Sequence, residues 1–170
     1  MNELTRDKNY PFELNRLGDA AGAEIRGVDL SQSFDDDLRD LMKRALVENH
    51  VLIFRDQDLS GEQQMVLTER FGTLERHLIH DAKGHESPQV HVIANVDEAG
   101  NPVNRIYGSF HWHTDKSYHD VPSFATFLHA RELPPDGGQT EFANMHLAYE
   151  NLDAEVKERI AGLKAITDLF

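Results

Sequence analysis

The residues of this 170-residue chain that could do chemistry are concentrated in the stretch His111-Trp112-His113-Thr114-Asp115. In a β-strand, alternate side chains point to one face, so His113 and Asp115 would lie together, about 6–7 Å apart along the chain. An imidazole beside a carboxylate can bind one divalent metal ion, and two histidines with one carboxylate suit ferrous iron. His111 shares that face, so the spacing alone does not choose between the two histidines.

Composition favours metal chemistry and excludes several other kinds of site. The chain has ten histidines and no cysteine, which excludes a disulfide scaffold, a zinc–thiolate site and a cysteine nucleophile. The net charge of −13 disfavours nucleic-acid and anionic-membrane partners, because acidic surfaces repel phosphate. The apolar runs are too short to span a bilayer, and the N-terminus lacks the apolar core of a signal peptide. We therefore expect a cytoplasmic protein.

Hydrophobic periodicity predicts the elements of the first half of the chain. Strands are expected at 10–14, 23–30 and 51–55. Between the last two, a helix is indicated by five apolar residues that repeat on one face: Leu38, Leu41, Met42, Ala45 and Leu46. A second helix should begin after Ser60, with Gln63 completing a capping box, and end at Gly72.

The second half is predicted to contain mainly short strands. Turn residues separate β-rich runs that are expected to form strands at 90–96, 110–114, 123–132 and 139–143. Two short helices should follow, the first starting near Asn144 and the second capped by Asp153. This mixture indicates an α+β fold with a sheet sandwich or barrel, in one domain over residues 1–170. Residues 165–170 look like the beginning of a strand, so we expect the domain to be incomplete.

Five stretches, in this order, resemble the family of taurine dioxygenase and 2,4-D dioxygenase (TauD/TfdA): Gly22–Leu30, Val51–Gln57, Glu69–Gly72, Trp112–Tyr118 and Leu133–Thr140. These relatives are Fe(II)- and 2-oxoglutarate-dependent oxygenases. The resemblance implies a double-stranded β-helix, a jelly-roll or cupin-like barrel with flanking helices, of which this chain is the N-terminal portion. The stretch Thr140–Met145 looks nearer to the 2,4-D branch than to the taurine branch.

The resemblance also implies roles for individual residues. His113 and Asp115 match the first histidine and the carboxylate that bind the metal. Thr140 matches the threonine that hydrogen-bonds a 2-oxoglutarate carboxylate, while His77 and Ser109 match substrate-side positions. His80 and His111 receive no role. The remaining histidines are interpreted as surface or packing residues: His50, His85, His91, His119, His129 and His146.

The family's second histidine ligand and its 2-oxoglutarate-binding arginine lie further downstream than residue 170. The implied reaction is hydroxylation of a small, often anionic, organic substrate by O2, with release of succinate and CO2. A homo-oligomer stays open. Two other functions also stay open. One is a cupin-like metal isomerase or hydrolase, which would not respond to 2-oxoglutarate. The other is an inactive fragment or non-catalytic module that associates through open sheet edges.

Overall fold

The computed structural model describes residues 10–74, 90, 93, 101, 111–164 and 166. The chain divides into two units. The first unit comprises Met1–Phe71 and His129–Lys164, and the second comprises Gly72–Leu128 and Ala165–Phe170. Within the described residues, all helices and strands belong to the first unit, and none of these helices is long and apolar enough to cross a membrane.

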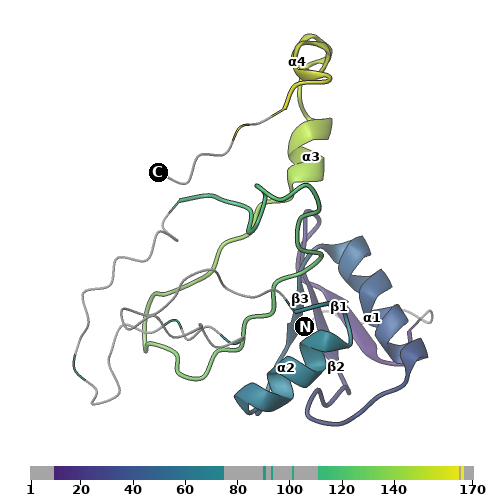
Figure 1. Ribbon diagram of the computed structural model, residues 1–170, viewed down its shortest axis with the longest axis vertical. Coiled ribbons are helices and arrows are strands. Elements are labelled where there is room, and N and C mark those ends of the chain that lie inside the picture. Colours follow the sequence, from purple (N-terminus) through teal and green to yellow (C-terminus); the bar gives the residue numbers. More distant parts are fainter. Residues whose placement is uncertain are drawn as a thin grey trace. The chain divides into compact units, whose positions relative to one another are not determined.

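A three-stranded mixed sheet forms the base of the first unit (Figure 1). Its strands are β1 (Glu13–Arg16), β2 (Ala23–Arg26) and β3 (Leu52–Phe54), in that spatial order. β1 pairs antiparallel with β2, whereas β2 pairs parallel with β3. A parallel pair requires a crossover connection, and a helix supplies it here. β2 and β3 lie within the predicted ranges 23–30 and 51–55, whereas β1 begins later than predicted and overlaps the range 10–14 only at Glu13 and Leu14.

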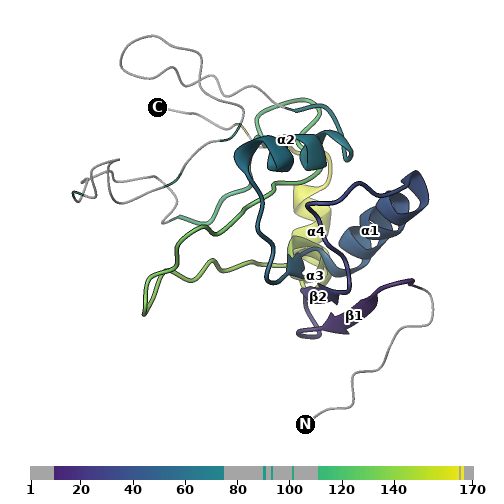
Figure 2. The same ribbon diagram turned by 90° about the horizontal axis from the view of Figure 1, so that it is seen from below.

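The crossover helix α1 (Asp36–Asn49) covers the sheet with the apolar face that its sequence predicts (Figures 1 and 2). Its N-cap residue Asp35 accepts a hydrogen bond from the backbone N–H of Leu38 at 2.8 Å. The helix ends at His50, whose backbone φ of 65° lies in the left-handed region. The buried core between helix and sheet consists of Tyr10, Phe12, Leu14, Ala23, Ile25, Met42 and Ala45.

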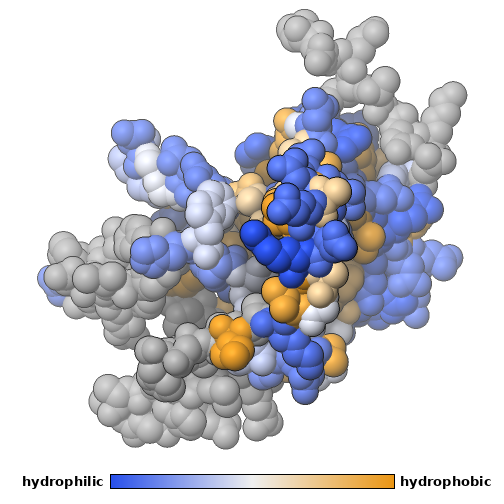
Figure 3. All heavy atoms as spheres, turned by 90° about the horizontal axis from the view of Figure 1, so that it is seen from above, coloured by the Kyte–Doolittle hydropathy of each residue, from blue (hydrophilic) through white to orange (hydrophobic). Residues whose placement is uncertain are grey.

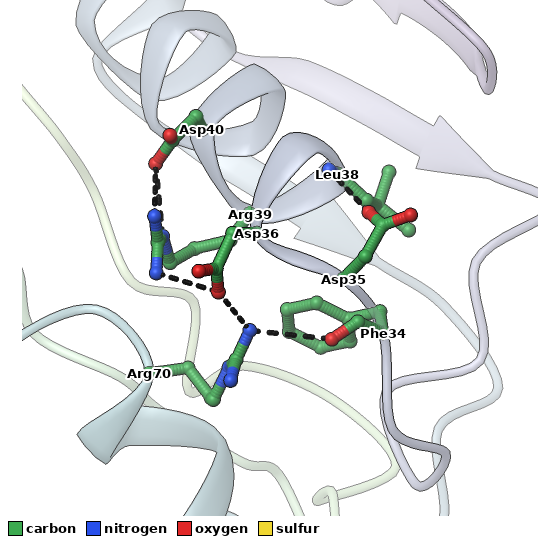
Figure 4. A network of polar contacts seen from close by, with 7 residues as sticks. All are labelled: Phe34, Asp35, Asp36, Leu38, Arg39, Asp40 and Arg70. Atoms are coloured by element: carbon green, nitrogen blue, oxygen red, sulfur yellow. Dashed lines mark hydrogen bonds and ion pairs between the residues drawn. The ribbon is translucent and has the colours of Figure 1, made fainter.

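Helix α2 (Gly61–Glu69) begins with the predicted capping box, in which Ser60 and Gln63 each bond the other's backbone N–H. The residue that follows the helix, Arg70, links its end to the start of α1 (Figure 4). Its Nη2 donates to Asp36 Oδ1 at 2.6 Å and to the Phe34 carbonyl at 3.2 Å. This arginine belongs to one of the motifs that carry the family resemblance, and its contacts join the end of α2 to the start of α1.

The central strand β2 carries a buried carboxylate. Glu24 is only 5% exposed, and its two oxygens accept hydrogen bonds from Arg26 Nε at 2.6 Å and Arg55 Nε at 3.2 Å. The hydrogen bond from Arg26, followed by that from Arg55, lowers the pKa of Glu24 below its usual 4.5. A charged group inside a fold needs such partners, because removing them would leave an uncompensated charge.

We expect the substitution Glu24→Gln to lower the free energy of unfolding at neutral pH. Because the folded-state pKa of Glu24 is lowered, its ionised form stabilises the fold above about pH 4.5, and this stabilisation disappears as the pH falls through the lowered value. The difference between wild type and variant should therefore shrink as the pH is lowered below about 4.5. Urea unfolding at a series of pH values measures it, and a difference independent of pH would contradict the assignment.

Two short helices follow in the same unit, α3 (Met145–Glu150) and α4 (Ala154–Ile160). As predicted, Asn144 caps α3, accepting from the Leu147 N–H at 3.1 Å, and its Nδ2 also donates to the Ala20 carbonyl. Asp153 occupies the N-cap position of α4, as predicted, but its side chain makes no capping hydrogen bond. In the view from above relative to Figure 1, hydrophobic and hydrophilic side chains are mixed on the surface (Figure 3).

The strands predicted in the second half are not found among the described residues. Residues 111–114, 123–132 and 139–143 have no regular secondary structure, and most of 90–96 lies outside the described residues. A strand is defined by its ladder to a partner, and β-rich composition favours an extended chain without choosing that partner. The described part is a mixed sheet with helices, and the double-stranded β-helix stays a prediction.

Candidate metal site

The His-x-Asp stretch lies in the second unit, in irregular structure that leads into a turn and not in a strand. Asp115 begins the turn, and Lys116 adopts a φ of 57°, in the left-handed region. The turn is closed by a hydrogen bond from the His119 N–H to the Lys116 carbonyl at 3.1 Å. No strand is present in this stretch, yet the imidazole of His113 and the carboxylate of Asp115 lie together, as the spacing predicts.

The ring of His113 faces Asp115, and its two nitrogens have different partners. Nε2 lies 3.3 Å from Asp115 Oδ1, and Nδ1 lies 2.7 Å from the backbone carbonyl oxygen of His111. A carbonyl oxygen can only accept, so Nδ1 carries the proton and donates it. In the neutral imidazole Nε2 then holds a lone pair, as a metal-binding nitrogen must. Of the two histidines, His113 is the one whose ring faces Asp115, whereas His111 contributes its backbone carbonyl.

The carboxylate of Asp115 is likewise held at one atom and open at the other. Thr126 Oγ1 donates a hydrogen bond to Oδ2 at 2.9 Å, while Oδ1 faces the histidine. Oδ1 and His113 Nε2 thus face each other at 3.3 Å, a contact that a proton on Nε2 or a cation held by both atoms would satisfy. The side chains of His113 and Asp115 are 54% and 50% exposed, so an ion from solvent can reach them.

The pair fits a divalent transition metal in geometry and in donor type. Ligand atoms about 2.1 Å from a metal and at right angles to one another lie roughly 3 Å apart, close to the observed 3.3 Å. Imidazole nitrogen with carboxylate oxygen suits iron(II) and manganese(II). Within the residues that the structure describes, no third histidine, aspartate or glutamate joins this pair.

The other predicted site residues fall in different places. Thr140 is an exposed residue of the first unit, in irregular structure shortly after Gly137 and Gly138. Both glycines have a positive φ, 76° and 73°, which explains why glycine occupies these positions. His77 and Ser109 lie outside the described residues, as does His80.

Sequence reasoning did not identify Thr126 as part of the site. It was expected only as a strand residue, and it lies eleven positions beyond the carboxylate that it contacts. A contact over that separation leaves no periodic signal in a single sequence. The structure shows it because the chain folds back on the turn.

The described histidines that were predicted to be surface or packing residues contact other parts of their unit or lie on its surface. His129 Nε2 lies 3.0 Å from the Gln57 carbonyl, near the end of β3. The rings of His50 and His146 stack with their centroids 5.6 Å apart, and His119 lies against Tyr118. His85 and His91 lie outside the described residues.

Comparisons with known proteins match nearly the whole chain. The family model described as Taurine catabolism dioxygenase TauD, TfdA family matches residues 13–170. A relative named (S)-phenoxypropionate/alpha-ketoglutarate-dioxygenase, from Sphingobium herbicidovorans, is 32% identical over 154 residues, covering 91% of this chain and 52% of the relative. The alpha-ketoglutarate-dependent 2,4-dichlorophenoxyacetate dioxygenase of Cupriavidus pinatubonensis is 30% identical over 164 residues, covering 89% of this chain and 56% of the relative.

Among solved structures, the crystal structure of AAD-2 in complex with Mn(II) and N-oxalylglycine superposes with a TM-score of 0.73 at 27% identity. The match covers 88% of this chain and 55% of that one. The chain thus spans about half the length of the curated relatives that it matches. On the evidence of a family match over residues 13–170, the chain belongs to the TauD/TfdA family of dioxygenases.

Proposed function

We propose that this chain is part of an enzyme that hydroxylates a small organic substrate with Fe(II), 2-oxoglutarate and O2, releasing succinate and CO2. The observation that carries the proposal is that the imidazole of His113 and the carboxylate of Asp115 face each other, with Nε2 and Oδ1 3.3 Å apart. They stand in a chain whose family and relatives are named as dioxygenases. We assign both residues as metal ligands.

The bound iron and 2-oxoglutarate would supply the oxidising chemistry, since cofactors perform the hard steps and the protein positions them. A proton on His113 Nδ1, donated to the His111 carbonyl at 2.7 Å, would leave the Nε2 lone pair of the neutral imidazole for the metal. Asp115 presents Oδ1 and contributes a negative charge that favours a divalent cation. Thr140 would hold a 2-oxoglutarate carboxylate through its hydroxyl, a role taken from the family resemblance.

We propose a small organic anion as the substrate class. The two relatives described above are named for phenoxypropionate and 2,4-dichlorophenoxyacetate, both aryloxy carboxylates. His77 and Ser109 are proposed to contact the substrate, with His77 facing its anionic group. A second histidine ligand and a 2-oxoglutarate-binding arginine are implied by the family pattern downstream of residue 170, so the activity is proposed for the whole enzyme.

The test is an anaerobic titration of the 170-residue chain with Fe(II) and 2-oxoglutarate, followed by visible absorption. We expect a weak charge-transfer band that requires both additions, because the band arises when 2-oxoglutarate binds the iron. A metal isomerase or hydrolase of the cupin type would bind the metal without responding to 2-oxoglutarate. A non-catalytic module would bind neither. Absence of the band would contradict assembly of the cofactor complex by this chain.

The same titration tests the proposed contact of Thr140 with 2-oxoglutarate separately from metal binding. Thr140→Val removes the hydroxyl while keeping the branched shape of the side chain. We expect this variant to need more 2-oxoglutarate for the half-maximal band, with unchanged binding of Fe(II) alone. Unchanged 2-oxoglutarate dependence would exclude Thr140 from the co-substrate site and leave the metal ligands standing.

A further inference from the structure

The carboxylate of Asp115 is fixed by a residue that belongs to a different stretch of the chain. Thr126 Oγ1 donates to Oδ2 at 2.9 Å, leaving Oδ1 toward the imidazole of His113. On the other side of the pair, the His111 carbonyl fixes the imidazole ring through Nδ1. Each candidate ligand is therefore held by one hydrogen bond on its far atom, Nδ1 of His113 and Oδ2 of Asp115.

We propose that Thr126 is a positioning residue for the metal ligand Asp115, an inference that rests on the proposed function. A carboxylate on a free side chain rotates about its Cβ–Cγ bond and can present either oxygen, or both, to a metal. The threonine hydroxyl engages Oδ2 and thereby selects Oδ1 as the metal-binding oxygen. Hydrogen-bonded partners of this kind orient ligands, and replacing them usually weakens metal affinity about 10–100-fold.

The same hydrogen bond has a consequence for the number of positions that the carboxylate occupies. With Oδ2 engaged by Thr126, Asp115 binds through one oxygen, so it takes one coordination position instead of two. A metal that must also accept a two-atom chelating co-substrate and O2 needs the remaining positions. Thr126 thus favours the coordination that the proposed reaction requires, although it touches neither the metal nor the substrate.

The test is Mn(II) binding to the 170-residue chain, measured from the electron paramagnetic resonance signal of free Mn(II). Thr126→Val keeps the shape of the side chain and removes the donor, so we expect the dissociation constant for Mn(II) to rise about tenfold or more. Thr126→Ser restores a hydroxyl and should restore most of the affinity. Far-UV circular dichroism of both variants checks that the fold is retained.

Asp115→Ala is the reference variant that distinguishes failure of the Thr126 positioning role from failure of the metal site itself. If Asp115→Ala loses Mn(II) binding while Thr126→Val binds as the wild type does, Thr126 has no positioning role and the metal assignment stands. If serine and valine weaken binding equally, the hydroxyl is not responsible and the inference is overturned. If the wild type fails to bind Mn(II), or Asp115→Ala binds it equally well, the proposed metal site is itself wrong.

Discussion

Replacing His113 by alanine is expected to abolish metal binding, whereas His111→Ala is expected to leave it nearly unchanged. The two residues are neighbours of the same type, and the structure uses them differently. His113 contributes its ring, with Nε2 facing Asp115 Oδ1 at 3.3 Å, while His111 contributes only its backbone carbonyl at 2.7 Å from Nδ1. Alanine at position 111 retains that carbonyl, so the orientation of the His113 ring should survive.

The magnitude of this effect should be large because a ligand atom itself is removed. Replacing a residue that only hydrogen-bonds a metal ligand already lowers metal affinity about 10–100-fold. Removing the His113 ring, a proposed ligand itself, should therefore lower the affinity by more than about 100-fold. The measurement is the dissociation constant for Mn(II), together with the charge-transfer band in the presence of Fe(II) and 2-oxoglutarate. Loss of binding in His111→Ala with retention in His113→Ala would reverse the assignment of the two histidines.

The part of the fold that the sequence predicted correctly is the part controlled by local interactions. The capping box of Ser60 and Gln63 spans three residues, and the apolar face of α1 repeats over a few turns. Both signals are complete within a short window of sequence. Asn144 caps α3 for the same local reason.

The parts that the sequence did not predict depend on contacts between distant residues. Sequence runs such as 123–132 are rich in β-forming side chains, but they pair with no other strand among the described residues. The hydrogen bond from Thr126 to Asp115 joins positions eleven apart. In the site, the spacing predicted that the side chains of His113 and Asp115 lie together, and their rings and oxygens do face each other at 3.3 Å although no strand is present there. That this pair binds a metal stays a proposal.

The largest stability effect in the first unit is expected from Met42→Ala. Met42 is 1% exposed on the buried face of α1, against the sheet, and it is the largest side chain in the described core with almost no solvent contact. Removing its thioether side chain sacrifices transfer free energy and leaves a cavity that neighbouring residues fill only partly. Substitutions of this kind cost about 2–5 kcal/mol in the free energy of unfolding.

The matched control lies on the same helix. Val47 is 62% exposed, so Val47→Ala should change the free energy of unfolding by less than about 0.5 kcal/mol. Urea denaturation followed by far-UV circular dichroism gives both values, provided that the denaturant slope stays constant between variants. A cost below about 1 kcal/mol for Met42→Ala would contradict the packing of α1 on the sheet, because a methionine that fills the core cannot be removed at so small a cost.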